Sequence, residues 1–431
     1  MNLGDGASGA AIAAVSPVHQ VAIVCGAALG LACGFGAMFF SVAGIFLKPI
    51  ATTFGWGRAD VALLPMLGMA GVAVGAPIVG HLAERMGWRR VIAASIALFA
   101  AVLLALSVSP PSRAYLAAVG FAGGLLAAAT TAAGYLAILP LVFDRRFGMA
   151  LGFGMLGSGL GGIVAPILAN ALIEALGWRQ AYLGLALVVL LFGALAHQLI
   201  FRTLRRARVS AEPHGGVRAS ARSAASGAGL SLGEALATFR FWLIAVIIFL
   251  VSCSILGGFV HLASFASDRG MSAELAARAT ALTGLGLAVS RVGVGAVLDL
   301  VFAPLVGLIA FALGAAGFAL LVYYPPELPL LLLLGALLLG VSTGAEGDLI
   351  PFLSRKYFGQ RAFSSIYGTL FGIATLGGAL GPFAYGAIFD RIRSYTPLHG
   401  ASALVCGACA LAILALGPYR YAPSNADDSS V

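Results

Sequence analysis

The stretch Gly80-His-Leu-Ala-Glu84-Arg85-Met-Gly87-Trp-Arg89-Arg90, at residues 80–90, is a charged loop between two apolar runs. The runs lie near 60–82 and 90–109. Each is long enough to cross the hydrocarbon core of a bilayer as a helix, which takes about 20 apolar residues. The same alternation of apolar run and short loop continues in both directions along the 431 residues. The sequence therefore predicts a chain that crosses a membrane many times.

The composition supports this prediction. Hydrophobic side chains make up 61% of the chain and charged residues only 10%, whereas soluble domains carry roughly 25% charged residues. So few polar residues exclude a soluble globule, a disordered chain and a secreted disulfide scaffold. The net charge of +9 comes from arginines between the apolar runs rather than from one basic face, so we expect no nucleic-acid partner.

We predict an all-α membrane protein with twelve transmembrane helices in two six-helix bundles. The apolar runs that define the spans lie near 19–46, 60–82, 90–109, 114–143, 148–174, 179–201, 241–267, 274–298, 302–323, 327–352, 363–388 and 399–418. The expected parts of the chain are an N-terminal tail (1–17), a first bundle (18–201), a basic linker (202–240), a second bundle (241–419) and a C-terminal tail (420–431). Within the linker, Ser231-Leu-Gly-Glu234 has the spacing of a capping box and predicts a short amphipathic surface helix.

The basic residues predict the orientation in the membrane, because loops rich in Lys and Arg stay in the cytoplasm. With both termini inside, the inner loops hold 16 basic residues and the outer loops hold eight. We therefore expect both termini, the linker and the loop at 80–90 to be cytoplasmic in an inner or plasma membrane.

The two halves of the chain repeat each other. Gly80-His-Leu-Ala-Glu84 matches Gly295-Ala-Val-Leu-Asp299 at an offset of 215 residues, and Leu139-Pro140 matches Ile350-Pro351 at an offset of 211. Parallel six-span repeats are typical of transporters that expose a site between the halves to each side of the membrane in turn.

The loop at 80–90 resembles the cytoplasmic loop signature of the major facilitator superfamily, Gly-x-x-x-Asp/Glu-Arg-x-Gly-x-Arg/Lys. With the span count, linker and repeat, this resemblance covers essentially the whole chain. It implies a conformational latch, in which Gly80 permits close helix contact while Glu84 and Arg85 hold the bundles together by ion pairs and helix-end dipoles. The residues of the expected latch are Gly80, Glu84, Arg85, Gly87, Arg89 and Asp299. Because no Arg follows Asp299, we expect an asymmetric latch; the alternative is an ordinary basic loop that contains one acid.

Within the superfamily, three stretches are similar to the monocarboxylate and oxalate/formate type of carrier. They are Phe54-Gly-Trp56-x-Arg58, Arg291-Val-Gly293-Val-Gly295, and Gly386-Ala-Ile-Phe-Asp390 followed by Ser394-Tyr395. The resemblance implies that Arg291 binds an anion. Two positions depart from the pattern: Leu287 replaces the acid that animal carriers place one turn before this Arg, and no Lys occurs near Ser41.

Three ionisable residues stand out within the spans, where a charge costs roughly 3 kcal/mol unless it is paired or hydrated. Arg291, Glu346 and Asp348 lie roughly 10–14 Å from the cytoplasmic boundary at 1.5 Å per helical residue. We expect Arg291 to bind substrate, because guanidinium gives a carboxylate two parallel hydrogen bonds, and a contact between Arg291 and Glu346 is feasible. Glu346 is either a proton carrier or a structural partner of Arg291, whereas for Asp348 a helix contact is favoured over proton coupling.

Other residues are weaker candidates. His261, in the seventh span, could titrate near neutrality, although a hydrogen-bonded packing role is favoured. Aromatic residues could shape a central cavity or simply pack; they are Phe40, Tyr135, Tyr367 and Phe371.

The predicted function is therefore proton-coupled transport of a small organic anion rather than an enzymatic reaction. An exporter of drugs or neutral metabolites is the alternative. We expect no cofactor and no metal. The expected partners are the solute, protons and the lipid bilayer, and we expect a monomer.

Overall fold

The computed structural model describes residues 16–143, 146–210, 228–323 and 328–421. Within these ranges the chain is helical and contains no β-strand. Twelve helical segments are long and apolar enough to cross a membrane, which confirms the predicted fold class.

The first bundle contains six of these segments. Its helices, in chain order, are α1 (Pro17–Ala32), the π-helix η1 (Gly36–Ser41), α2 (Ala43–Phe54), α3 (Arg58–Met86), α4 (Trp88–Ser107), α5 (Arg113–Ala127), the 3₁₀ helix η2 (Ala128–Thr130), α6 (Ala132–Tyr135), the 3₁₀ helix η3 (Leu136–Leu141), α7 (Phe147–Leu176) and α8 (Trp178–Ser210).

The second bundle contains the other six. Its helices are α10 (Leu232–Leu236), which precedes the first span, then α11 (Phe239–Asp268), α12 (Ala273–Leu298), α13 (Ala303–Tyr323), α14 (Pro329–Phe358), α15 (Phe363–Ile392), α16 (Thr396–Ala412) and the 3₁₀ helix η5 (Ile413–Leu416).

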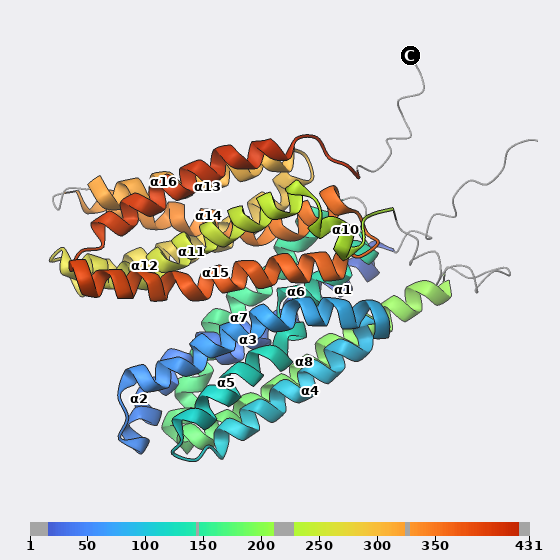
Figure 1. The fold of residues 1–431 in the computed structure, drawn as a ribbon. Coiled ribbons are helices and arrows are strands. Elements are labelled where there is room, and N and C mark those ends of the chain that lie inside the picture. The colour runs from blue at the N-terminus through green and yellow to red at the C-terminus, as the bar shows by residue number, and fades with distance from the viewer. Residues whose placement is uncertain (1–15, 144–145, 211–227, 324–327, 422–431) are drawn as a thin grey trace, which may run out of the picture.

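The two bundles lie side by side and meet through two pairs of helices. Helix α3 packs on α15, and α7 packs on α12. Figure 1 shows that the bundles are close at the end where α10 lies and diverge toward the end where α2 lies. We call the first of these the linker end; Glu84, Asp299 and Ser365 lie there. The arrangement is that of a two-bundle protein joined at one end.

Two spans of the first bundle are broken rather than continuous, which the apolar pattern does not predict. The first span changes from α1 through Cys33 to the π-helix η1, and the fourth span is interrupted at Thr130 and Thr131. The two breaks meet, since the amide of Phe35 donates to Thr130 Oγ1 at 3.1 Å. Breaks of this kind in membrane helices often accompany binding sites, because they turn backbone groups toward the protein interior.

Two features lie near the predicted linker. The capping box is confirmed, because Ser231 Oγ accepts from the amide of Glu234 while the Glu234 carboxylate accepts from the amide of Ser231. The sixth span, however, continues beyond the predicted limit at residue 201, and α8 runs 33 residues to Ser210. Arg and Leu are good helix formers, so the basic segment extends the helix to roughly 50 Å, well beyond the membrane core of about 30 Å.

Candidate functional site

A cluster of buried polar groups lies within the second bundle, and it consists of Arg291 on α12, Asp348 on α14 and Tyr367 on α15. The three groups interact electrostatically. None is hydrogen-bond satisfied within the described residues: Arg291 Nε and Nη1, both carboxylate oxygens of Asp348 and the Tyr367 hydroxyl lack partners. A buried polar group without a partner is costly, so such a cluster indicates a site that a ligand completes.

Helix packing brings Arg291 to this position. A side chain at Gly152 of α7 would place its Cβ 2.1 Å from the carbonyl oxygen of Arg291, so only glycine permits the two helices to cross here. On the other side, the guanidinium lies against Gly347 of α14, where a Cβ would be 3.7 Å from Arg291 Nη1. Met155 of α7 approaches the same point. Arg291 therefore lies where the second bundle meets the first.

Glu346 belongs to a different contact. Ser252 Oγ of α11 donates a hydrogen bond to Glu346 Oε1, and no ion pair between Arg291 and Glu346 occurs among the described residues. The expected contact between Arg291 and Glu346 is therefore corrected: the acid that interacts with Arg291 is Asp348. The physical reason is the helix period, since residues two apart on α14 point about 200° apart.

His261 has partners at both ring nitrogens. Nδ1 lies 3.0 Å from the hydroxyl of Tyr395, and Nε2 lies 3.0 Å from the carbonyl oxygen of Pro382. The ring thus connects α11 to α15 and to the turn after it. This geometry favours the packing role, because a histidine held on both sides has no free nitrogen to offer a moving proton.

The aromatic candidates divide into two groups. Tyr367 stacks on Phe363 and meets Phe371 edge to face, so Tyr367 and Phe371 belong with the Arg291 cluster. Tyr135 instead packs on α1, where a Cβ at Gly30 would overlap its ring. Phe40 is 41% exposed on the π-helix η1. The structure does not bring Tyr135 or Phe40 together with Arg291.

At the linker end, one acid of each bundle accepts hydrogen bonds from backbone amides of the other bundle. Glu84 Oε1 accepts from the amide of Ser365, 2.9 Å away near the start of α15. Asp299 accepts from the amides of Gly148 and Met149, at 2.8 and 2.9 Å, at the start of α7. Carboxylates at helix N-termini are favourable because they satisfy free amides and oppose the helix dipole.

This geometry changes the expected asymmetry of the latch. Both repeats use their acid in the same way, although only the first has the following Arg. Arg85 is exposed and forms no ion pair within the described ranges. The side chain of Arg89 is exposed too, while its carbonyl contacts His197 of the same bundle. Within the described residues, the hydrogen bonds to the latch acids thus come from backbone amides, and Asp299 also interacts electrostatically with Lys356.

Glycines permit the close approach at the latch. A Cβ at Gly80 would lie 2.2 Å from the carbonyl oxygen of Ser364 in the other bundle. Gly87 has a positive φ of 82° and ends α3 just after the latch acid, so that α4 can begin at Trp88. The expected role of Gly80 in close helix contact agrees with this geometry.

Sequence reasoning missed several residues that complete these contacts. Arg355 crosses between the bundles, since its Nη1 donates to the carbonyl oxygen of Phe143 and its guanidinium lies 4.9 Å from the centre of the Phe147 ring. Ser252 and Ser365 were also missed. Of these residues, only Arg355 could have been identified from the sequence, because it lies beside the second copy of the repeat. A serine in an apolar run has no feature that marks it as functional.

Among the described residues, no group of three or more His, Cys, Asp and Glu side chains could hold a metal ion. The cysteines are separate and unpaired as disulfides, and four of the five are buried or half-buried.

Comparisons with known proteins agree with the fold. The Major Facilitator Superfamily profile matches residues 27–382. The chain is 28% identical to monocarboxylate transporter 11 of Mus musculus over 88% of this chain and 83% of the relative. It is 29% identical to a gallate transporter of Pseudomonas putida, over 85% of each chain.

Solved structures show the same fold at lower identity. The human organic anion transporter MFSD10 superposes with a TM-score of 0.65 and 17% identity, over 92% of this chain and 100% of that one. The fucose:proton symporter of E. coli superposes with a TM-score of 0.62 and 14% identity, over 93% of this chain and 98% of that one. With twelve spans in two bundles and a family match over most of its length, the chain belongs to the major facilitator superfamily and is an integral, multi-pass membrane transporter.

Proposed function

We propose that the protein transports a small organic carboxylate together with a proton, by alternating access around Arg291. The observation that carries this proposal is the unsatisfied cluster of Arg291, Asp348 and Tyr367 at the meeting of the bundles. A carboxylate would accept hydrogen bonds from Arg291 Nε and Nη1 and from the Tyr367 hydroxyl, which supplies the partners that these groups lack.

The relatives support the same class of solute. Monocarboxylate transporters and a gallate transporter align with most of this chain. Gallate is itself an aromatic carboxylate, and Phe363 and Phe371 flank Tyr367 with ring centres 5.7 and 6.0 Å from it. Aromatic rings beside a guanidinium suit a solute with an apolar or aromatic body and one carboxylate.

Coupling to protons is assigned to Asp348. In the solute-free protein, the positive charge of Arg291 offsets part of the cost of burying the Asp348 carboxylate. A bound solute carboxylate would pair with the guanidinium and leave Asp348 without a counter-charge. A buried carboxylate in that state is costly unless a proton neutralises it. Solute and proton would then bind together and leave together. In animal carriers the corresponding acid lies one turn before the Arg, at the position of Leu287 in this chain. The acid proposed here, Asp348, lies on another helix.

The carrier would open alternately to each side. Bundle contacts at the linker end close one side, and the bundles diverge at the other (Figure 1). With the linker end cytoplasmic, as the basic loops predict, the side that these bundle contacts close is the cytoplasmic side. Opening to the cytoplasm would require the Glu84 and Asp299 contacts to break.

Uptake into proteoliposomes tests the proposal. With an inward proton gradient, we expect accumulation of one or more of lactate, pyruvate, oxalate and gallate. Arg291→Gln should abolish uptake, and Arg291→Lys should restore little of it, because an ammonium group cannot form the two parallel bonds.

Arg278→Gln is the matched control, since Arg278 lies on the same helix in an exposed pair with Glu274. Normal uptake by Arg291→Gln would refute the anion-binding role. Export of a lipophilic cation with no carboxylate uptake would instead favour the drug exporter.

A further inference from the structure

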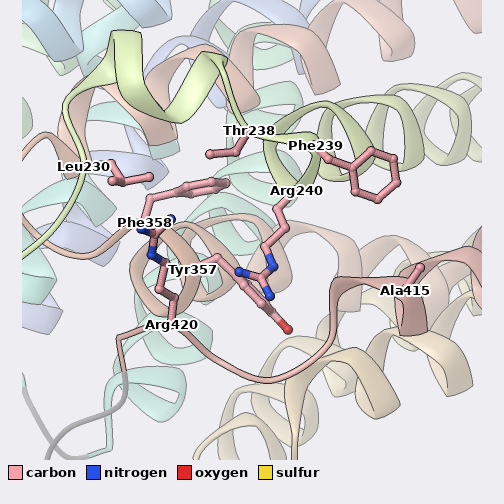
Figure 2. Close-up of a pocket in the computed structure, with 8 residues that line it drawn as sticks. All are labelled: Leu230, Thr238, Phe239, Arg240, Tyr357, Phe358, Ala415 and Arg420. Atoms are coloured by element: carbon pink, nitrogen blue, oxygen red, sulfur yellow. The ribbon is translucent and has the colours of Figure 1, made fainter.

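A pocket outside the transport site lies at the linker end of the second bundle. Its volume is about 320 Å³, and it lies among the start of α11, the end of α14 and the segment after η5 (Figure 2). Arg240, Tyr357 and Arg420 are among the lining residues. No role in the transport cycle described above requires this pocket.

Two arginines give the pocket a positive charge. Arg240 is held in place because its Nε donates to the carbonyl oxygen of Leu416 at 3.0 Å, and its guanidinium lies 5.7 Å from the centre of the Tyr357 ring. Among the described residues, its Nη1 and Nη2 groups donate no hydrogen bond. Figure 2 shows the guanidinium group of Arg240 beside the Tyr357 ring and that of Arg420 turned toward Phe358. The pocket thus presents guanidinium donors from two separate segments.

The nearest acid offsets this charge only in part. Glu234 accepts from the amide and the hydroxyl of Ser231, pairs with Arg361 at 3.3 Å and interacts electrostatically with Arg420. The hydrogen bonds from Ser231 hold the pKa of Glu234 below its usual range, so the carboxylate is charged. Arg361 and Arg420 thus share one acid, and Arg240 forms no ion pair within the described residues. Lys356 adds a further positive charge at the same end of α14. The local balance therefore favours an anionic ligand.

One side of the pocket continues onto an apolar helix face. Phe239, Trp242 and Val246 of α11 are 70%, 54% and 52% exposed, and their spacing of three and four residues places them on one face. Phe239 also lines the pocket. In a membrane protein, an exposed apolar helix face contacts lipid tails. A molecule in the pocket would therefore meet guanidinium groups at one end and a lipid-facing helix at the other.

We propose that this pocket binds the phosphate headgroup of an anionic phospholipid, with an acyl chain along Phe239, Trp242 and Val246. Arginine favours phosphate because its planar donors bind two oxygens at once. Aromatic residues are typical of the level at which headgroups meet tails. A soluble phosphate compound would use the arginines but not the α11 face, so the combination favours lipid over a free anion.

Lipid binding to the full-length protein provides the test. Native mass spectrometry of detergent-solubilised protein, titrated with phosphatidylglycerol or with phosphatidylcholine, should show selective retention of phosphatidylglycerol. Arg420→Gln should weaken that binding roughly fivefold, and Arg240→Gln with Arg420→Gln more strongly. Arg420 is exposed, so its replacement keeps the fold even if the change at Arg240, which is tied to Leu416, does not. Arg90→Gln, an exposed arginine at the same end of the first bundle, is the control and should bind normally.

Three outcomes would overturn the proposal. They are equal retention of the two lipids, normal phosphatidylglycerol binding by Arg420→Gln, and competition by inorganic phosphate or glycerol phosphate at the concentration at which the lipid binds. The last result would show a site for a soluble phosphate. None of these measurements depends on the transported solute, so failure here leaves the transport proposal intact.

Discussion

The guanidinium of Arg291 lies against Gly347 of α14, and of the two acids that flank this glycine in the sequence only Asp348 interacts with it electrostatically. Spacing in the sequence identified all three charges as buried and at a similar depth. It could not decide which acid faces α12 and which faces α11, because that depends on how α14 is rotated in the bundle. The cluster forms only where three helices pack together, with Arg291 on α12, Asp348 on α14 and Tyr367 on α15.

Asp348→Asn should separate exchange from accumulation. An amide cannot carry a proton at this position, so solute exchange across proteoliposomes without a gradient should persist, while accumulation driven by a pH gradient should stop. Glu346→Gln should keep accumulation, since Glu346 bonds to Ser252 and not to the Arg291 cluster. The opposite pattern, with accumulation lost in Glu346→Gln and kept in Asp348→Asn, would move the coupling role to Glu346.

Among the elements, apolar runs predicted the twelve spans but not the breaks within them. A break at Thr130 and Thr131 leaves the average apolarity of the fourth span almost unchanged, so an apolar window does not detect it. The same limitation applied to α8, whose basic end leaves the membrane but stays helical to Ser210. Only packing shows that α7 and α12 cross at Gly152.

Gly152→Ala should disfavour the closed linker end. Its methyl group would lie 2.1 Å from the carbonyl oxygen of Arg291, so the two helices must separate. Overpacking of this kind costs about 1–3 kcal/mol. Labelling of a cysteine introduced at the linker end should become faster, and the rate of solute transport should fall.

Gly159→Ala lies two turns along the same helix and meets no atom within 4 Å. It should transport normally and label slowly, because its methyl group meets no neighbouring helix and leaves the crossing of α7 and α12 unchanged. Equal behaviour of the two variants would show that the crossing at Gly152 does not limit closure.

For the whole molecule, the internal repeat predicted where the bundles would be joined, because it placed an acid at the same point of each half. It could not show that the acids bind backbone amides, since any residue but proline supplies an amide. The twelve spans could thus be deduced from residues alone. The partners across the interface required coordinates.

The latch acids should act additively on the balance between the two states of the carrier. Glu84→Gln and Asp299→Asn each remove a carboxylate from a helix N-terminus, which is worth about 0.3–2 kcal/mol. Distances between spin labels at the linker ends of the bundles should show more open molecules in each single variant and most in the double variant. Independent sites are expected to add.

Glu274→Gln removes an exposed acid at the other end of α12 and should leave the distances unchanged. A double variant with the wild-type distribution would mean that α3 with α15, and α7 with α12, hold the linker end closed without the two carboxylates.

Because Glu84 and Asp299 bind amides rather than side chains, these hydrogen bonds do not select the side chains at positions 149 and 365; Gly148 is fixed for another reason, since a Cβ there would lie 2.3 Å from the carbonyl oxygen of Gly295. Searches for covarying residue pairs would consequently find no signal from the amide contacts themselves, even though they hold one side of the carrier closed. Proline is the sole natural residue without an amide hydrogen, and introducing it at position 365 would disable one half of the gate while leaving the acid untouched.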